Sequence, residues 1–189
     1  MTELSYNYED PYEILNGKIF YMTPRPSTDH NKVIRNLIII IGNYLKDKKC
    51  QLFSDGVDVF LDDANNVIPD LMIVCNQDII KKKGIYGAPD LIVEVLSPST
   101  AANDRGYKKE LYENHEIKEY WIVDINNKSI DVHLLKNKKF VLDNVYSIYP
   151  NYLLEKMKQE EIKQIKTEFK ISLFDDLIID IQSVFASIE

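Results

Sequence analysis

A chain of 189 residues that is 45% hydrophobic and 28% charged has enough apolar material for one core, so we expect a single globular domain over residues 1–189. Its net charge of −7 argues against a general nucleic-acid coat protein, whose affinity comes from a basic surface, but leaves room for a local basic groove. The first residues carry acids instead of a basic, apolar leader, and no apolar run approaches the length of a membrane span, so we expect a cytoplasmic protein without membrane association.

The first elements expected along the chain are a β-hairpin and a long helix. Asn16-Gly17 separates two alternating apolar stretches, which is a strong signal for a tight hairpin turn. Ser27 or Thr28 can cap a helix in which apolar residues recur at helical spacing, namely Ile34, Leu37, Ile41 and Leu45. His30 extends this stripe by one turn. A core or capping histidine is the simpler interpretation, and a position in a functional site is the alternative.

Two strands in the middle of the chain each carry an acid. After a half-exposed strand over residues 51–62, the runs Val67–Cys75 and Leu91–Leu96 are rich in Val, Ile and Leu, which is typical of strands covered on both faces. Asp70 interrupts the first run and Glu94 the second. An ionised carboxylate in such a strand is costly unless it is paired, hydrogen-bonded or bound to a cation. If the strands pair, the two carboxylates lie close together and repel each other unless a divalent cation satisfies both, and Mg²⁺ or Mn²⁺ suits such oxygen ligands.

Further helices and a second hairpin are expected over the rest of the chain. Asn103 or Asp104 can cap a helix that runs to about residue 116, and a hairpin follows over residues 118–136. The tail predicts two more helices, over residues 154–167 and 173–185.

A lysine on the first of these helices is the third candidate for the site. Lys108 stands three and four residues before Leu111 and Tyr112, so it projects from the helix face that packs on the sheet. A lysine beside two acids balances their charge, orients an attacking water or stabilises charge that builds on a phosphate. The alternative is a structural ion pair with Asp104 or Glu94, which spacing alone does not distinguish from a catalytic role.

Other reactive groups give little support for a different chemistry. Cys50 and Cys75 are isolated and lack metal-ligand spacing, so we expect them to be reduced packing residues. The sequence contains no G-x-S-x-G elbow, Walker loop or Cys/His zinc spacing.

At the candidate residues the sequence resembles the Uma-type restriction endonuclease family, within the PD-(D/E)xK nuclease superfamily. The resemblance rests on the order and spacing of four blocks, NGKIFYMTPRPSTDHN, VIPDLMIV, APDLIVEVLSPSTAANDRGYKKELYE and IKEYWIVD. It implies a restriction-endonuclease-like α/β fold with a central mixed β-sheet flanked by helices. It also implies that Asp70 and Glu94 are metal ligands, with the backbone carbonyl of Val95 as a further ligand.

The sequence departs from the superfamily motif at the lysine. That lysine normally stands two residues after the second acid, where this chain has Leu96, and the resemblance suggests that Lys108 has taken over its role. A further superfamily acid often comes from an early segment. Glu13 is the candidate for it, and Lys18 occupies a place where an acid is expected. Asp104 either orients Lys108 or caps the helix, and capping is the simpler interpretation.

These features predict a metal-dependent endonuclease that hydrolyses phosphodiester bonds, with DNA as the expected substrate and Mg²⁺ or Mn²⁺ as cofactor. Cleavage of both strands of a duplex by one site per subunit requires two subunits, so a homodimer is expected. Two other classes stay open. One is a catalytically inactive nuclease fold that acts as a nucleic-acid or protein-binding module, and the other is a structural protein whose acids are satisfied by internal hydrogen bonds.

Overall fold

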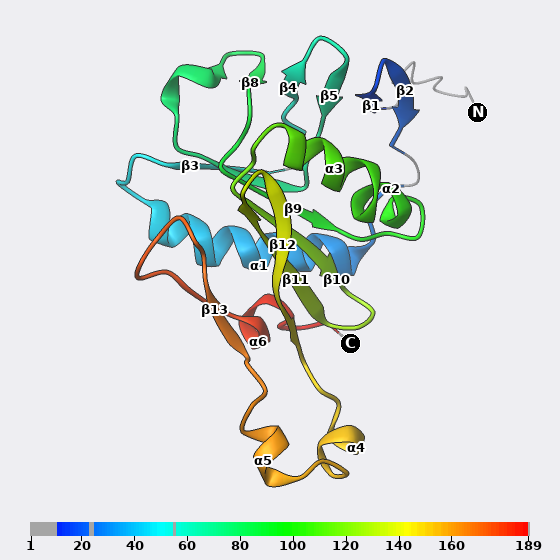
Figure 1. The fold of residues 1–189 in the computed structure, drawn as a ribbon, viewed down its shortest axis with the longest axis vertical. Helices are drawn as coiled ribbons and strands as arrows, with labels where there is room; N and C mark the ends of the chain where they lie inside the picture. The colour runs from blue at the N-terminus through cyan, green and yellow to red at the C-terminus, as the bar shows by residue number, and fades with distance from the viewer. Residues whose placement is uncertain (1–10, 23–24, 55, 189) are drawn as a thin grey trace, which may run out of the picture.

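The computed structural model describes residues 11–22, 25–54 and 56–188 (Figure 1). In chain order its elements are β1 (Tyr12–Leu15), β2 (Lys18–Tyr21), α1 (Thr28–Leu45), β3 (Gln51–Ser54), β4 (Val59–Asp62), β5 (Asn65–Val67), β6 (Leu71–Val74), the 3-10 helix η1 (Gln77–Ile79), β7 (Ile80–Lys81), β8 (Gly84–Tyr86), β9 (Leu91–Val95), α2 (Ala101–Arg105), α3 (Tyr107–Asn114), β10 (Glu119–Asp124), β11 (Ser129–Lys136), β12 (Lys139–Ser147), α4 (Asn151–Leu154), α5 (Gln159–Ile162), β13 (Glu168–Lys170), β14 (Ile178–Asp180) and α6 (Ile181–Val184).

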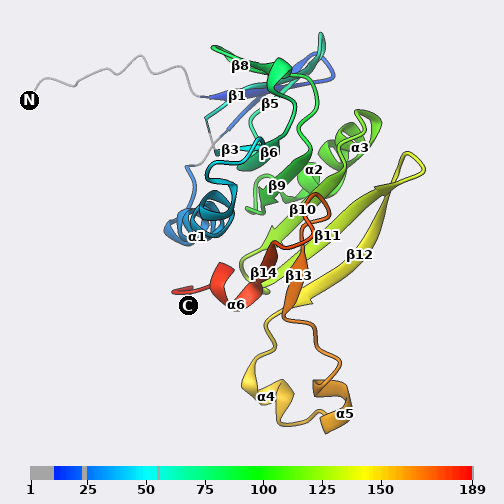
Figure 2. The same cartoon turned by 90° about the vertical axis from the view of Figure 1, so that its left-hand side faces the viewer.

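A mixed six-stranded sheet lies at the centre, in the order β12-β11-β10-β9-β6-β3. Strands β9 and β10 are parallel, and the other neighbours are antiparallel. Helix α1 packs on one face through Val33, Leu37 and Ile41, together with the C-terminal elements. Helix α3 covers the other face through Leu111 and Tyr112 (Figures 1 and 2). Strands β6 and β9 are therefore buried on both faces, as the sequence predicts.

The first hairpin and the first helix are confirmed. Asn16 and Gly17, with φ angles of 51° and 72°, form the turn between β1 and β2. The side chain of Ser27 caps α1 by accepting a hydrogen bond from the backbone N–H of His30. The expected apolar stripe of this helix is buried against the central sheet.

A second six-stranded sheet, in the order β2-β1-β5-β4-β8-β7, packs on the same side of the central sheet as α3. Its inner residues Leu15, Val59, Val67 and Ile85 share a core with the inner residues of α3. The sequence predicts the first hairpin of this sheet but not the sheet itself, because most of its strands have only two to four residues.

Two predicted strands are each divided between the two sheets. The prediction of one continuous strand over residues 51–62 is wrong. The chain turns at Gly56, with a φ of 92°, so that β3 lies in the central sheet and β4 in the second sheet. The strand expected over Val67–Cys75 is also interrupted. Pro69 has no N–H to donate to a ladder, so β5 ends before it and β6 begins at Leu71. Asp70 therefore lies just before a strand rather than within one.

The helix expected to begin at residue 103 starts earlier and is broken. It begins at Ala101 and is interrupted at Gly106, which separates α2 from α3. Asn103 and Asp104 lie inside α2, so the prediction that either of them caps this helix is wrong. The break turns α3 so that its buried residues are Lys108, Leu111 and Tyr112.

Neither helix predicted for the tail forms. Residues 154–167 contain only the end of α4 and the single turn α5, and these elements project away from both sheets (Figures 1 and 2). Residues 173–185 contain β14 and the short α6. The carboxylate of Glu119 fixes the segment before them by accepting hydrogen bonds from the backbone N–H and the hydroxyl of Ser172. In the part of the chain that the structure describes, every helix is too short or too polar to cross a membrane.

The prediction that Cys50 and Cys75 are reduced, separate residues is wrong in the structure. They form a disulfide that joins β3 to β6, next to the antiparallel pair Gln51 and Val74. Their sequence separation of 25 conceals this proximity, which only the strand pairing creates.

His133 on β11 gives the fold a measurable pH dependence. Its side chain is buried against the rings of Tyr120 and Phe140, and its Nδ1 atom has no hydrogen-bond partner among the described residues. Burial, with a smaller contribution from Lys109, lowers the pKa of His133 from 6.5 to about 4. Between these two pH values the His133 side chain is protonated in the unfolded chain and neutral in the folded protein. The contribution of His133 to the free energy of unfolding is therefore complete above pH 6.5 and is lost as the pH falls toward 4.

We expect the substitution His133→Phe to remove this pH dependence. In urea unfolding at about pH 7.5 and about pH 5, the wild type should lose about 2 kcal/mol more than the variant on acidification. Equal losses in the two proteins would show that His133 is protonated in the folded state.

Candidate active site

The pairing of β6 with β9 brings the two acids of the sequence analysis together. The strands are antiparallel with Leu71 opposite Val93, so Asp70 and Glu94 meet one step further along the register. The Oδ2 atom of Asp70 accepts a hydrogen bond of 2.7 Å from the backbone N–H of Val95. This contact fixes the Asp70 carboxylate beside the end of β9, where Glu94 turns its side chain toward α3.

Asp90 makes the equivalent contact at the other end of the same strand pair. It also follows a proline and precedes a strand, and its Oδ2 atom accepts a hydrogen bond of 2.7 Å from the backbone N–H of Cys75. Asp90 pairs with the exposed Lys118 rather than with the buried lysine of α3. The two aspartates thus have the same structural contact but different surroundings.

Lys108 is the centre of a buried acidic cluster. Its Nζ atom lies 2.8 Å from Glu13 Oε1, 3.1 Å from Glu94 Oε1 and 3.7 Å from Asp104 Oδ1. These acids come from β1, β9 and α2, and each is less than 10% exposed, as is Lys108 itself. The structure therefore brings Glu13, which is distant in the sequence, to the same lysine as Glu94 and Asp104.

Glu13 also links the second sheet to the turn before Asp70. Its Oε1 atom accepts a hydrogen bond of 2.9 Å from the backbone N–H of Ile68. Strand β1 therefore helps to position the Pro69 turn as well as the lysine. Lys18, by contrast, lies on β2 with its side chain exposed and makes no contact with the cluster among those the structure records.

His30 reaches the site from the first turn of α1. Its Nε2 atom lies 3.2 Å from Asp70 Oδ1, and both side chains are largely buried. Ser27 rather than His30 provides the helix cap. The imidazole therefore contacts Oδ1 of Asp70, whereas Val95 donates to Oδ2. His30 thus lies beside the candidate site, which is the alternative to a core or capping role in the sequence analysis.

Tyr112 is a site residue that the sequence analysis does not identify as functional. Its hydroxyl donates a hydrogen bond of 2.6 Å to Glu94 Oε1, the same oxygen that contacts Lys108. The signal in the sequence is its spacing, because residues four apart on a helix project in the same direction. Tyr120 also contacts the cluster, because its hydroxyl donates a hydrogen bond of 2.9 Å to the backbone oxygen of Asp104.

The cluster carries more acids than the lysine can neutralise. Burial raises the pKa of Glu94 well above its usual range, and although Lys108 opposes this, repulsion from Asp104, Asp70 and Glu13 adds to it. Burial also raises the pKa of Asp104. Burial alone would lower the pKa of Lys108, but the attraction of Glu94, Glu13 and Asp104 outweighs it and raises that pKa. Lys108 is therefore charged at neutral pH, and the site has a surplus of negative charge that a proton or a cation can neutralise.

One solved structure shares this architecture, and one further protein is similar in sequence. A crystal structure titled "a putative nuclease belonging to DUF820" from Anabaena variabilis superposes with a TM-score of 0.69 at 17% sequence identity, covering 94% of this chain and 90% of that chain. An uncharacterized protein of Synechocystis sp., slr1290, is 29% identical over 126 residues, which is 66% of each chain and so just under two thirds of that relative's length.

The central mixed sheet, its flanking helices and the structural match define a protein with the restriction-endonuclease-like fold, as the resemblance in the sequence implies. The chain belongs to the Uma2 family, whose model, described as "Putative restriction endonuclease", matches residues 3–155.

Proposed function

We propose that this protein is a metal-dependent endonuclease that hydrolyses phosphodiester bonds in DNA. The observation that supports this most is the convergence on β9 of Asp70, Glu94 and the buried ammonium group of Lys108. Membership of a family described as restriction endonucleases supports the nuclease class. The choice of DNA follows from that description.

The residues present fit a divalent cation. The surplus of negative charge that raises the pKa of Glu94 would be relieved by Mg²⁺ or Mn²⁺, and carboxylate oxygens are the ligands that these ions prefer. Asp70 and Glu94 would hold the ion, with the backbone carbonyl of Val95 as a further ligand. Among the described residues, no three His, Cys, Asp or Glu side chains form a ready-made metal group, so water and substrate would complete the coordination. The bound cation would supply Lewis-acid activation of the phosphodiester.

The side chains of the cluster would divide the remaining work. Because Lys108 stays protonated at neutral pH, it acts as a donor that orients water or stabilises charge building on the phosphate, and not as a general base. Tyr112 and Lys108 hold the same oxygen of Glu94 and so fix its orientation. Asp104 and Glu13 keep the lysine in place. Two such subunits would be needed to cut both strands of a duplex, so we propose a homodimer.

A binding module without turnover is the second candidate. It is favoured by the complete engagement of Lys108 in ion pairs and by Leu96 at the position where the superfamily has its lysine. This candidate predicts DNA binding that is indifferent to Mg²⁺ and to the loss of Glu94.

Calorimetric titration with Mn²⁺, alone and with a short DNA duplex, distinguishes the two candidates. We expect the wild type to bind the ion, Asp70→Asn to lose both binding and cleavage, and Asp90→Asn to retain both. Asp90 is the matched control because its carboxylate makes the same backbone contact away from the cluster. If the wild type binds no Mn²⁺ even with the duplex, or if Asp70→Asn still cleaves, the proposed mechanism is wrong.

A further inference from the structure

The second sheet has an outer face on which one row of side chains crosses five strands. Ile14 is paired directly with Ile19 and with Asn66, Asn66 with Phe60, and Phe60 with Tyr86. Directly opposite residues project to the same face of a sheet. These five residues, which we call the outer row, therefore lie on the face away from the central sheet, while Glu13 and the other inner residues face the cluster.

The outer row is apolar except for Asn66, and its two ends are exposed while Ile14, Asn66 and Phe60 between them are half-buried. Ile19 is 55% exposed and Tyr86 is 46% exposed, and Tyr86 stacks on Phe60 with ring centroids 4.6 Å apart. A second pair on the same face, Tyr12 and Tyr21, is 40% and 65% exposed. Several exposed apolar side chains gathered on one sheet face are typical of an interaction site.

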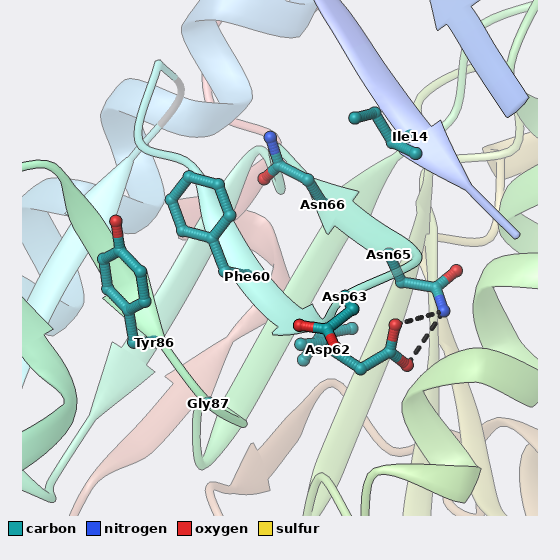
Figure 3. Close-up of a pocket in the computed structure, with 9 residues that line it drawn as sticks. Ile14, Phe60, Asp62, Asp63, Asn65, Asn66, Tyr86 and Gly87 are labelled. Carbon is teal, nitrogen blue, oxygen red and sulfur yellow. Dashed lines mark hydrogen bonds between the residues drawn. The ribbon is translucent and has the colours of Figure 1, made fainter. Parts of the chain in front are cut away.

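The charges beside the outer row argue against a polyanion. A hollow of about 510 Å³ adjoins Phe60 and Tyr86 and is also lined by Asp62 and Asp63 (Figure 3). The row itself contains no charged side chain. Lys81 projects to the same face beside the row, because it pairs with Gly84, two residues before Tyr86 on β8. A phosphate backbone on this face would therefore meet two carboxylates and this one lysine, a net negative charge, whereas another apolar protein face would lose little by burying the row.

The exposed area is sufficient for a pair of subunits. A fully exposed aromatic side chain presents about 200 Å², so the exposed parts of Tyr12, Ile19, Tyr21 and Tyr86 amount to roughly 400 Å². With the partly buried residues and the rim, two copies of this face would bury about 1,000 Å² in total, the lower bound for a specific interface.

We propose that the outer face of the second sheet is the surface through which two copies of this chain pair, sheet against sheet. The same patch would serve both subunits, as a two-fold axis requires. The inference names the surface for the homodimer of the proposed function and rests on that subunit pairing, but not on hydrolysis or metal binding.

Sedimentation velocity over a concentration series tests the inference with Ile19→Asp and Tyr86→Asp, at the two ends of the outer row. The matched control is Ile39→Asp on α1, because Ile39 is 53% exposed and lies on a different surface. We expect the wild type and Ile39→Asp to dimerise alike. Each outer-row variant should dissociate at least about tenfold more readily, since it places a charge in an apolar interface, and its far-UV circular dichroism should be unchanged.

Three results would overturn the inference. The wild type could remain monomeric at all concentrations up to about 100 µM, or both outer-row variants could dimerise as tightly as the wild type and Ile39→Asp. Alternatively, the outer-row variants could remain dimeric and lose binding to single-stranded oligodeoxythymidine, which would make this face a stacking platform for bases. Because no readout is cleavage or metal binding, failure here would leave the proposed hydrolysis standing, and a monomeric wild type would remove only the proposed homodimer.

Discussion

Replacing Lys108 with methionine should lower the free energy of unfolding by about 3–5 kcal/mol and remove nuclease activity, because the substitution leaves buried carboxylates without their countercharge. Glu13, Glu94 and Asp104 all contact the Lys108 ammonium, and none of them has enough exposure to be solvated instead. Urea unfolding at neutral pH measures the loss. The deficit should shrink as the pH falls, because protonation of the carboxyl groups removes their mutual repulsion.

Lys109→Met is the control for this prediction. Lys109 is the next residue on α3 but does not belong to the buried face of the helix, so its substitution should change stability by less than about 0.5 kcal/mol. A cost of less than about 1 kcal/mol for Lys108→Met would mean that the acids already carry protons and do not depend on the lysine.

Glu94→Gln should have the opposite balance of effects. Since its surroundings raise the pKa of Glu94, the folded protein disfavours the ionised form, and a neutral amide of the same shape should leave stability unchanged or raise it by about 1 kcal/mol. Cleavage should nevertheless fall by roughly 10³-fold or more, because a metal ligand and a charge at the reacting phosphate are lost. Thermal unfolding and a nuclease assay on the same preparations measure both effects.

Glu119→Gln provides the comparison from the neighbouring strand. Glu119 is equally buried, but its oxygens accept hydrogen bonds from Trp121 and Ser172 and have no contact with Lys108. Burial raises the pKa of Glu119 as well, but both of its oxygens accept hydrogen bonds, so the amide nitrogen of glutamine would face a donor. This substitution should therefore reduce stability and leave the cleavage rate of the folded protein unchanged. If Glu94→Gln behaved like Glu119→Gln, Glu94 would be a structural residue and the nuclease proposal would fail.

The sequence predicts what depends on local pattern. The Asn16-Gly17 turn and a cap at Ser27 or Thr28 follow from residues close together in the chain, and the structure contains the turn and the Ser27 cap. The apolar runs around Asp70 and Glu94 are also local patterns, whereas their pairing is only a condition in the sequence analysis, and the structure meets it. Spacing on one helix also places Lys108 on the face that meets Glu94.

What the sequence does not predict depends on distant contacts. The tail has helical periodicity over residues 173–185, yet β14 forms there because it pairs with β13 and buries Ile179 in the core. The contact between His30 and Asp70 requires the first turn of α1 to meet the start of β6, which no spacing reveals. The disulfide of Cys50 with Cys75 depends in the same way on the pairing of β3 with β6.

The place of Lys108 on a helix changes how the site is held together. A lysine two residues after Glu94 would be fixed by the ladder of the sheet, whereas Lys108 is fixed by the packing of one short helix. Tyr112 stands one turn further along α3 and donates a hydrogen bond to the same oxygen of Glu94, so two side chains of one helix hold this carboxylate. A rotation of α3 by one residue, about 100°, would move Lys108 and Tyr112 away from Glu94 together. At the strand position itself, Leu96 is half-buried and packs against the apolar core that α3 shares with the second sheet.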